Sequence, residues 1–101
     1  MDGPEARRGR FDSAPPPDTG ERFTELARMG NVVVESIVSS ASPYDGVYLQ
    51  AQDEWVMLVD GSAELDVDGD HVSLTAGDWV LLPAGVPHRV LRTSHGARWL
   101  A

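Results

Sequence analysis

Segment 77–88 constrains the fold more than any other part of the chain, because it sets a short apolar run between closely spaced chain breakers. Residues 79–82 form the apolar run, and Pro83 ends it because proline has no amide hydrogen to donate to a neighbouring strand. A glycine and a second proline then bend the chain before His88 opens the next run. This arrangement predicts a short strand, a tight loop and a second strand that begins at a histidine.

Short strands are expected over most of the chain. From residue 31 onward, apolar and polar residues mostly alternate, which is typical of strands with one buried face. Asp68-Gly69 is the strongest hairpin signal, while run 54–60 is apolar nearly throughout and predicts burial on both faces. Turn residues between the runs favour an all-β barrel or sandwich. The expected strands cover residues 32–38, 47–51, 54–60, 63–67, 71–75, 79–82, 88–92 and 97–100.

The N-terminal part departs from this pattern. Residues 1–20 combine glycine, proline and charge with few bulky apolar side chains, so burial cannot offset the entropy of ordering them. We expect a disordered arm whose arginines either dock on the acidic body or remain in solvent. In residues 21–29, apolar side chains recur at helical spacing and predict one short helix. The expected organisation is therefore an arm followed by a single domain over residues 21–101.

Composition excludes several classes of function. The net charge of −8 disfavours nucleic acid and anionic membrane surfaces as partners. The chain has no cysteine and no lysine, which excludes thiolate zinc sites, a cysteine nucleophile and Schiff-base chemistry. No apolar run is long enough to span a membrane, and no hydrophobic signal region opens the sequence. We expect a cytoplasmic protein. With 101 residues its core is small, so a homodimer that covers more apolar surface is expected.

Two motifs resemble those of the cupin superfamily, the small double-stranded β-helical barrels. The spacing Gly-x5-Pro-x-Gly-x2-His matches the second cupin motif at Gly77, Pro83, Gly85 and His88. The second half of the first motif, Glu-x6-Gly, is matched by Glu54 and Gly61. The histidine pair that precedes this glutamate in the family is missing. Its positions fall on Tyr48 and Gln50 with a spacer of three residues, or on Val47 and Leu49 with four, and only the first choice supplies polar groups. The resemblance implies that His88 points into the barrel, where this histidine often ligates a metal.

The chain is more specifically similar to a group of small single-domain bacterial cupins of the cupin-2 type. The similarity covers about seventy residues, from 32 to 100. It implies an all-β, jelly-roll-like double-stranded β-helix, here with one short N-terminal helix. The shared segments are Ile37-Val38-Ser39-Ser40, Tyr48-x-Gln50-x3-Glu54-Trp55-Val56, Pro83-Ala84, His88-Arg89-Val90 and Trp99-Leu100-Ala101.

The expected site combines the two motifs. Gln50, Glu54 and His88 offer an amide oxygen, a carboxylate and an imidazole, which suit a divalent ion such as Fe, Mn, Ni, Co or Zn. Glu54, His88 and Tyr48 are the candidate catalytic residues. Tyr48 and Arg92 are candidate substrate-binding residues, because Arg92 shares strand parity with His88 and can attract a carboxylate. The alternatives are a structural hydrogen-bonded His88–Glu54 pair, a packing role for Tyr48 and a surface position for Arg92.

Two main functional hypotheses follow. The first is a divalent-metal-dependent enzyme that acts on a small organic acid or carbonyl compound, as an oxygenase, isomerase, cyclase or lyase. The second is a non-catalytic barrel that binds a small molecule. A third is an accessory protein whose arginine-containing arm tethers it to a larger enzyme. Metal bound per chain, before and after substitution of Glu54 or His88, separates the first two.

Overall fold

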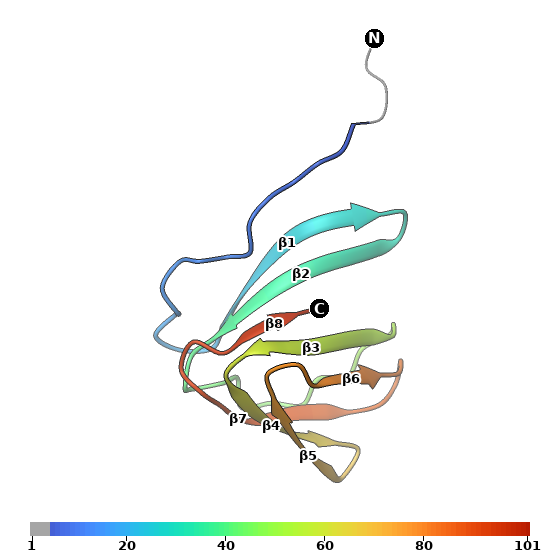
Figure 1. Ribbon diagram of the computed structural model, residues 1–101. Coiled ribbons are helices and arrows are strands. Elements are labelled where there is room, and N and C mark those ends of the chain that lie inside the picture. Colours follow the sequence, from blue (N-terminus) through green and yellow to red (C-terminus); the bar gives the residue numbers. More distant parts are fainter. Residues whose placement is uncertain (1–4) are drawn as a thin grey trace.

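Two antiparallel sheets face each other in the computed structural model, which describes residues 5–101 (Figure 1). The larger sheet has the strand order β1-β2-β8-β3-β6, and the smaller has the order β5-β4-β7. The all-β prediction is confirmed, and the described residues contain no helix. The strands are β1 (Glu21–Met29), β2 (Val32–Ser39), β3 (Glu54–Asp60), β4 (Ser62–Val67), β5 (Asp70–Thr75), β6 (Trp79–Leu82), β7 (His88–Thr93) and β8 (Arg98–Leu100).

The helix expected at residues 21–29 was wrong: this segment is strand β1, paired with β2 along its length. Between Glu25 and Ala27, β1 carries one residue more than β2, so Leu26 forms a β-bulge. The extra residue interrupts the alternation and leaves apolar side chains at helix-like spacing. Gly30 begins the hairpin turn from β1 to β2 with a φ of 60°, a conformation that glycine adopts readily.

The hairpin expected at Asp68-Gly69 is confirmed. Val67 pairs with Asp70, so only these two residues connect β4 to β5. Asp68 and Gly69 have φ values of 51° and 90°, and positive φ at both turn positions matches the right-handed twist of the flanking strands.

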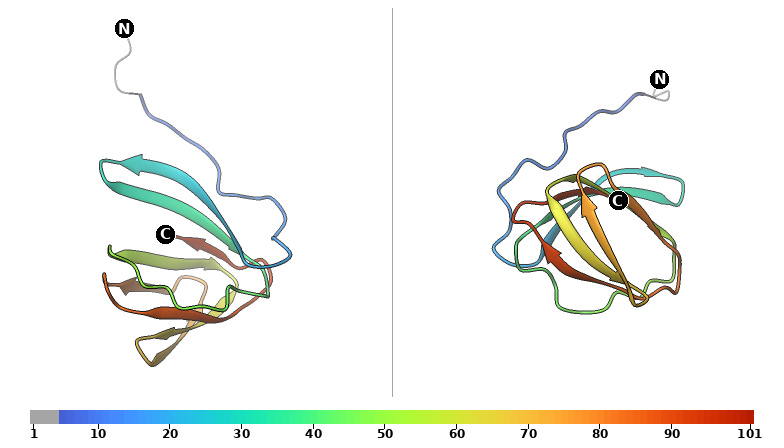
Figure 2. Two further views of the ribbon diagram at one scale, coloured as in Figure 1. Left: turned by 180° about the vertical axis from the view of Figure 1, so that it is seen from behind. Right: turned by 60° about the horizontal axis from the view of Figure 1, so that its bottom comes forward.

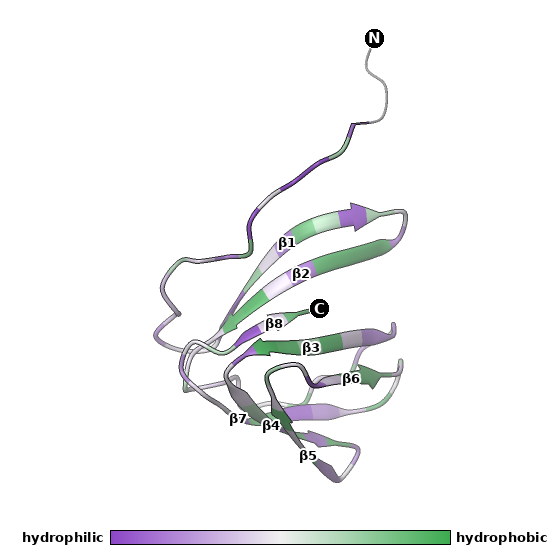
Figure 3. Ribbon diagram, viewed as in Figure 1, coloured by the Kyte–Doolittle hydropathy of each residue, from purple (hydrophilic) through white to green (hydrophobic). Residues whose placement is uncertain are grey.

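Strand β3 differs from its prediction. Its inner residues Val56 and Leu58 are buried between the sheets, but Trp55 and Val59 on the opposite face are 40% and 43% exposed. The prediction of burial on both faces was therefore wrong for the single chain. The core is formed by the inward residues alone. Figure 3, which colours each residue by hydropathy, shows hydrophobic stretches on β2 and β3.

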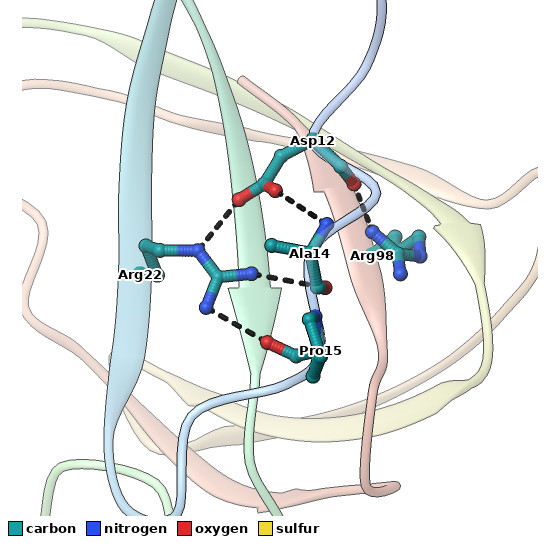
Figure 4. A network of polar contacts seen from close by, with 5 residues as sticks. All are labelled: Asp12, Ala14, Pro15, Arg22 and Arg98. Atoms are coloured by element: carbon teal, nitrogen blue, oxygen red, sulfur yellow. Dashed lines mark hydrogen bonds and ion pairs between the residues drawn. The ribbon is translucent and has the colours of Figure 1, made fainter.

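The segment before β1 has no regular secondary structure in residues 5–20 and lies outside the two sheets (Figures 1 and 2). Arg22 fastens it, since its guanidinium donates to Asp12 Oδ2 at 2.6 Å and to the carbonyls of Pro15 and Ala14 (Figure 4). Arg98 donates to the Asp12 carbonyl. The hydrogen bond from Arg22 lowers the pKa of Asp12. From the sequence, we considered that arginines of the arm dock on the acidic body. In the structure, an aspartate of the arm instead contacts arginines of the body.

Segment 40–53 connects β2 to β3 without the strand expected at residues 47–51. Its only ladder contact is an isolated bridge between Tyr48 and His88. Within residues 5–101, no helix is long and apolar enough to cross a membrane.

Candidate functional site

A cavity of about 70 Å³ opens between the two sheets. Its walls are apolar side chains from both sheets, and its polar groups come from β1, β3, β7 and segment 40–53. The lining residues are Glu21, Phe23, Ile37, Tyr48, Gln50, Glu54, Val56, Leu65, Leu82, His88, Val90 and Trp99. A small apolar chamber with a few convergent polar groups is the usual form of a small-molecule site.

Glu54 and His88 meet in this cavity. Glu54 begins β3, and His88 begins β7 after the proline-rich loop, so each side chain enters from the end of a strand. Nε2 of His88 lies 3.9 Å from Oε1 of Glu54, too far for a hydrogen bond but close enough for both atoms to contact one ligand atom. Only 7% of His88 is exposed. The structure thus brings together two side chains that are thirty-four positions apart.

Backbone hydrogen bonds hold segment 48–54 against the loop before His88. Tyr48 and His88 exchange two such bonds, at 2.7 and 3.0 Å, and Gly85 donates to the carbonyl of Gln50 at 2.9 Å. The amide of Ala84 donates to Asp53 Oδ1, also at 2.9 Å. This loop, set by its glycine and prolines, therefore positions Tyr48 and Gln50 beside His88 although neither lies in a regular strand.

Tyr48 and Gln50 complete the polar end of the cavity. The Tyr48 ring stacks on the His88 imidazole with centroids 5.4 Å apart and planes inclined by 16°. Burial raises the pKa of Tyr48, with further increases from nearby Glu21, Tyr44 and Glu54, so its hydroxyl stays protonated and able to donate. Gln50 Nε2 donates to Glu54 Oε2 over 3.4 Å.

Glu21 is a site residue that the sequence analysis missed. It enters the cavity from the start of β1, where its Oε2 accepts a hydrogen bond from Ser39 Oγ at 2.9 Å. Ser39 in turn accepts one from the indole Nε1 of Trp99 at 3.0 Å. Burial raises the pKa of Glu21, the Ser39 hydrogen bond opposes that rise, and the charge of Glu54 adds to it. Strand parity could have identified Glu21, but only after residues 21–29 had been assigned as a strand.

Arg92 does not line the cavity. On β7, one extra residue near Leu91 shifts the register with β4, so Arg92 lies opposite Glu64 and not on the His88 side. Its Nε donates to Glu64 Oε2 at 2.8 Å, and this bond lowers the Glu64 pKa. His71 also contacts Glu64, at 3.2 Å, and is exposed. Arg92 is an even number of residues from His88, but because of this bulge the two side chains do not lie on the same side of the strand.

Three residues of the cavity are candidate ligands of a metal ion. Glu54 lies within hydrogen-bond reach of Gln50 and within ion-pair reach of His88, and the amide, carboxylate and imidazole of these residues suit borderline divalent ions. These three donors fit an ion held at a site with open positions. Residues 5–101 contain no group of three histidine, cysteine, aspartate or glutamate side chains that could hold one.

A protein-family comparison decides the family, because the model described as "Cupin domain" matches residues 44–101, more than half of the chain. The chain belongs to the cupin family. A solved structure from Ralstonia eutropha JMP134, provisionally described as a mannose-6-phosphate isomerase, is 35% identical, with 94% of each chain covered and a TM-score of 0.81. The resemblance inferred from the two sequence motifs is thereby confirmed.

Other cupins match over less sequence. Quercetin 2,3-dioxygenase of Bacillus subtilis strain 168 is 40% identical over 45 residues, which cover 45% of this chain but only 13% of that protein. KdgF from Halomonas sp. is 15% identical with a TM-score of 0.73, covering 80% of this chain and 74% of its own. At that identity the similarity shows the shared fold. A shared fold does not determine the reaction, which must be argued from the site.

Proposed function

We propose that this cupin binds a small organic molecule in the cavity and moves a proton on it with the Glu54–His88 pair. The observation that carries the proposal is the 3.9 Å separation of Glu54 Oε1 and His88 Nε2 inside an apolar chamber. Two proton-accepting groups that lie 3.9 Å apart without bonding each other can both contact one ligand atom that lies beside them. Apolar walls strengthen the interactions of both groups with that ligand because they exclude water.

Each polar residue has a distinct task in this proposal. Nδ1 of His88 lies 3.5 Å from the Val86 carbonyl, which only accepts hydrogen bonds, so this long contact favours the proton on Nδ1. Nε2 is then free to accept a proton from the ligand, as is the Glu54 carboxylate. The Tyr48 hydroxyl donates to a ligand oxygen on which charge develops. Removal and return of a proton beside a carbonyl group is the isomerisation that these groups can support.

The phosphorylated sugar named for the Ralstonia eutropha structure is not carried over to this chain. A phosphate group needs arginine, lysine or clustered backbone N–H groups, and the cavity lining contains no arginine or lysine. For the same reason, the small organic acid expected from the sequence is disfavoured as a ligand of the metal-free cavity. The expectation depended on Arg92, which contacts Glu64 outside the cavity.

A divalent ion held by Gln50, Glu54 and His88 is the second candidate. Two ligands of one ion lie 3–4 Å apart when each bond is about 2.1 Å long, and the Glu54–His88 separation of 3.9 Å falls in that range. When bound, such an ion supplies Lewis-acid polarisation of a ligand oxygen. Tyr48 would still orient that oxygen, and the apolar walls would still exclude water.

Ligand binding and turnover by single variants test the proposal. A library of small carbonyl compounds and alcohols is screened by thermal shift on tagless protein, with metal per chain measured in the same preparation. Glu54→Gln keeps the side-chain shape and His88→Gln keeps a polar group of similar length, so both are expected to bind the best ligand within about tenfold of wild type. Each is expected to lose about 100-fold or more in turnover, the usual scale of general acid–base catalysis.

The chain offers a matched control on its surface. His71 and Glu64 also form a histidine–glutamate contact, at 3.2 Å, but lie on the exposed face of the smaller sheet. His71→Gln and Glu64→Gln should leave binding and turnover unchanged. Turnover that survives in Glu54→Gln and His88→Gln would remove the proton-transfer proposal, and stoichiometric metal that both variants lose would favour the second candidate.

A further inference from the structure

We propose that the cavity selects a ligand carrying a small organic ammonium group, and that Glu21 is the counter-ion of that group. This inference rests on the proposed function for the same cavity and names the class of its ligand. It follows from the charges, the free acceptors and the size of the site.

The charges of the lining are all of one sign. Glu21 and Glu54 are the two ionisable carboxyl groups among the lining residues, which include no arginine or lysine. The arginine beside Glu21 on β1, Arg22, holds the N-terminal segment, and Arg92 of β7 pairs with Glu64. Two carboxylates that share an apolar chamber repel each other, and a positive ligand group relieves that repulsion. An anionic ligand would increase it.

His88 supplies an independent indication of a ligand. Its side chain is more than nine-tenths buried and lines the cavity, yet its Nε2 has no hydrogen-bond partner within residues 5–101. With the proton on Nδ1, which faces the Val86 carbonyl, Nε2 is a hydrogen-bond acceptor. Nε2 faces the cavity, where a donor on the ligand can reach it.

Acceptors therefore dominate the chamber. Ser39 occupies one Glu21 oxygen and, with Trp99, fixes the direction of the carboxylate, which leaves Oε1 for a ligand. Glu54 and His88 add two more acceptors. An ammonium group has three donors and no acceptor, so it matches this arrangement better than a carboxylate or phosphate does. The cavity volume of about 70 Å³ admits a group of only a few heavy atoms.

The aromatic side chains add to this preference. Phe23, Tyr48 and Trp99 line the same cavity, and the face of an aromatic ring attracts a cation within about 6 Å of its centroid. Apolar carbon atoms attached to the ammonium would contact Ile37 and Leu65 on the opposite walls. One end of the ligand is thus expected to be charged and the other apolar.

A series of three ligands of one shape tests the inference on the full-length, metal-free protein. Propylammonium, 1-propanol and propionate differ chiefly in charge, and binding is followed by NMR from the indole signal of Trp99 at constant ionic strength. Propylammonium is expected to saturate the signal, 1-propanol to bind at least tenfold more weakly, and propionate not to bind. Tenfold is the lower end expected for a charge-assisted hydrogen bond in place of a neutral one.

Substitution of Glu21 tests its assigned role. Glu21→Gln should weaken propylammonium at least tenfold and leave 1-propanol unchanged, while Glu21→Asp, which keeps the charge, should recover part of the loss. Glu25→Gln is the matched control, because Glu25 lies on the same strand but is exposed and paired with Arg28. Unchanged propylammonium binding in Glu21→Gln would overturn the inference. If this variant does not fold, the ligand series on wild type decides alone.

The remaining outcomes separate this inference from the proposed function. Propionate binding as tightly as propylammonium, or no saturable binding of propylammonium, overturns the ammonium inference but leaves the Glu54 and His88 turnover test untouched. Mg²⁺, Mn²⁺ and Zn²⁺ are titrated alone in parallel. If these ions bind with dependence on His88 and propylammonium does not bind, the preferred cation is a metal ion and the inference is wrong.

Discussion

Replacement of Ser39 by alanine should destabilise the protein through a single hydroxyl group. Ser39 is fully buried, and its Oγ donates to Glu21 at 2.9 Å while accepting from the Trp99 indole at 3.0 Å. Alanine removes both bonds without adding bulk. Each buried group left without a partner costs about 1–3 kcal/mol, and Glu21 retains some solvent, so we expect a loss of about 2–4 kcal/mol.

Urea denaturation followed by tryptophan fluorescence measures this loss. The midpoint should fall while the m-value stays constant, since the surface exposed on unfolding is nearly unchanged. In a Trp99→Phe background, the loss of unfolding free energy caused by Ser39→Ala should be smaller by about 1 kcal/mol, because the indole donor is already absent. The NMR-measured pKa of Glu21 should rise further, since the hydrogen bond from Ser39 lowers it in wild type.

The control is Ser73→Ala on the exposed face of β5, which should change stability by less than about 0.5 kcal/mol. A midpoint for Ser39→Ala equal to that of Ser73→Ala would refute the reasoning. It would mean that neither Glu21 nor Trp99 depends on this hydroxyl, and that Glu21 is not held in the direction that the ligand proposal requires.

Three further results are expected. Because the folded-state pKa of Glu21 is raised above its ordinary value of 4.5, its contribution to stability is present below about pH 4.5 and is lost as pH rises through the folded pKa. Glu21→Gln should remove that dependence in pH-resolved urea titrations, and an unchanged pH profile would contradict the burial argument. Arg22→Ala should release the segment around Asp12, measured as faster amide exchange at residues 12–15, whereas protection equal to wild type would contradict the role of Arg22. Sedimentation should detect a homodimer that Trp79→Lys dissociates, since Trp79 and Trp55 lie exposed with ring centroids 6.1 Å apart; a wild-type monomer would exclude it.

The sequence was most informative where a local rule acts alone. Asp68-Gly69 predicted its hairpin because few residue pairs accept positive φ at both turn positions. The two cupin motifs predicted that Glu54 and His88 lie in one barrel. This prediction came from the family resemblance, so the strand order did not have to be deduced. The loop from Pro83 to His88 predicted where β7 begins, because proline and glycine restrict the backbone whatever surrounds them.

Two bulges explain two of the errors. One extra residue at Leu26 made β1 resemble a helix and hid Glu21 from the site. One extra residue near Leu91 reversed the parity of β7, so Arg92 turned away from the cavity and met Glu64. Alternation identifies a strand face only while each residue has one partner, and a bulge depends on the neighbouring strand, which the local sequence does not reveal.

Tertiary contacts account for other differences. Tyr48 and Gln50 reach the cavity from an irregular segment, because backbone bonds to His88 and Gly85 replace the expected strand. The ion pair between Arg22 and Asp12 joins two residues whose spacing follows no strand or helix period, so no sequence pattern predicts it.

The side-chain ¹⁵N spectrum of the histidines tests the central claim most directly. It is recorded for the free protein and for the protein saturated with the tightest ligand of the small-molecule screen. We predict that Nε2 of His88 is a hydrogen-bond acceptor in the free protein, and that ligand binding shifts this nitrogen while His71 and His95 stay unchanged. An Nε2 that carries its proton in the free protein, or a His88 signal that the bound ligand leaves unmoved, would contradict the claim that Glu54 and His88 act together on a molecule in the cavity.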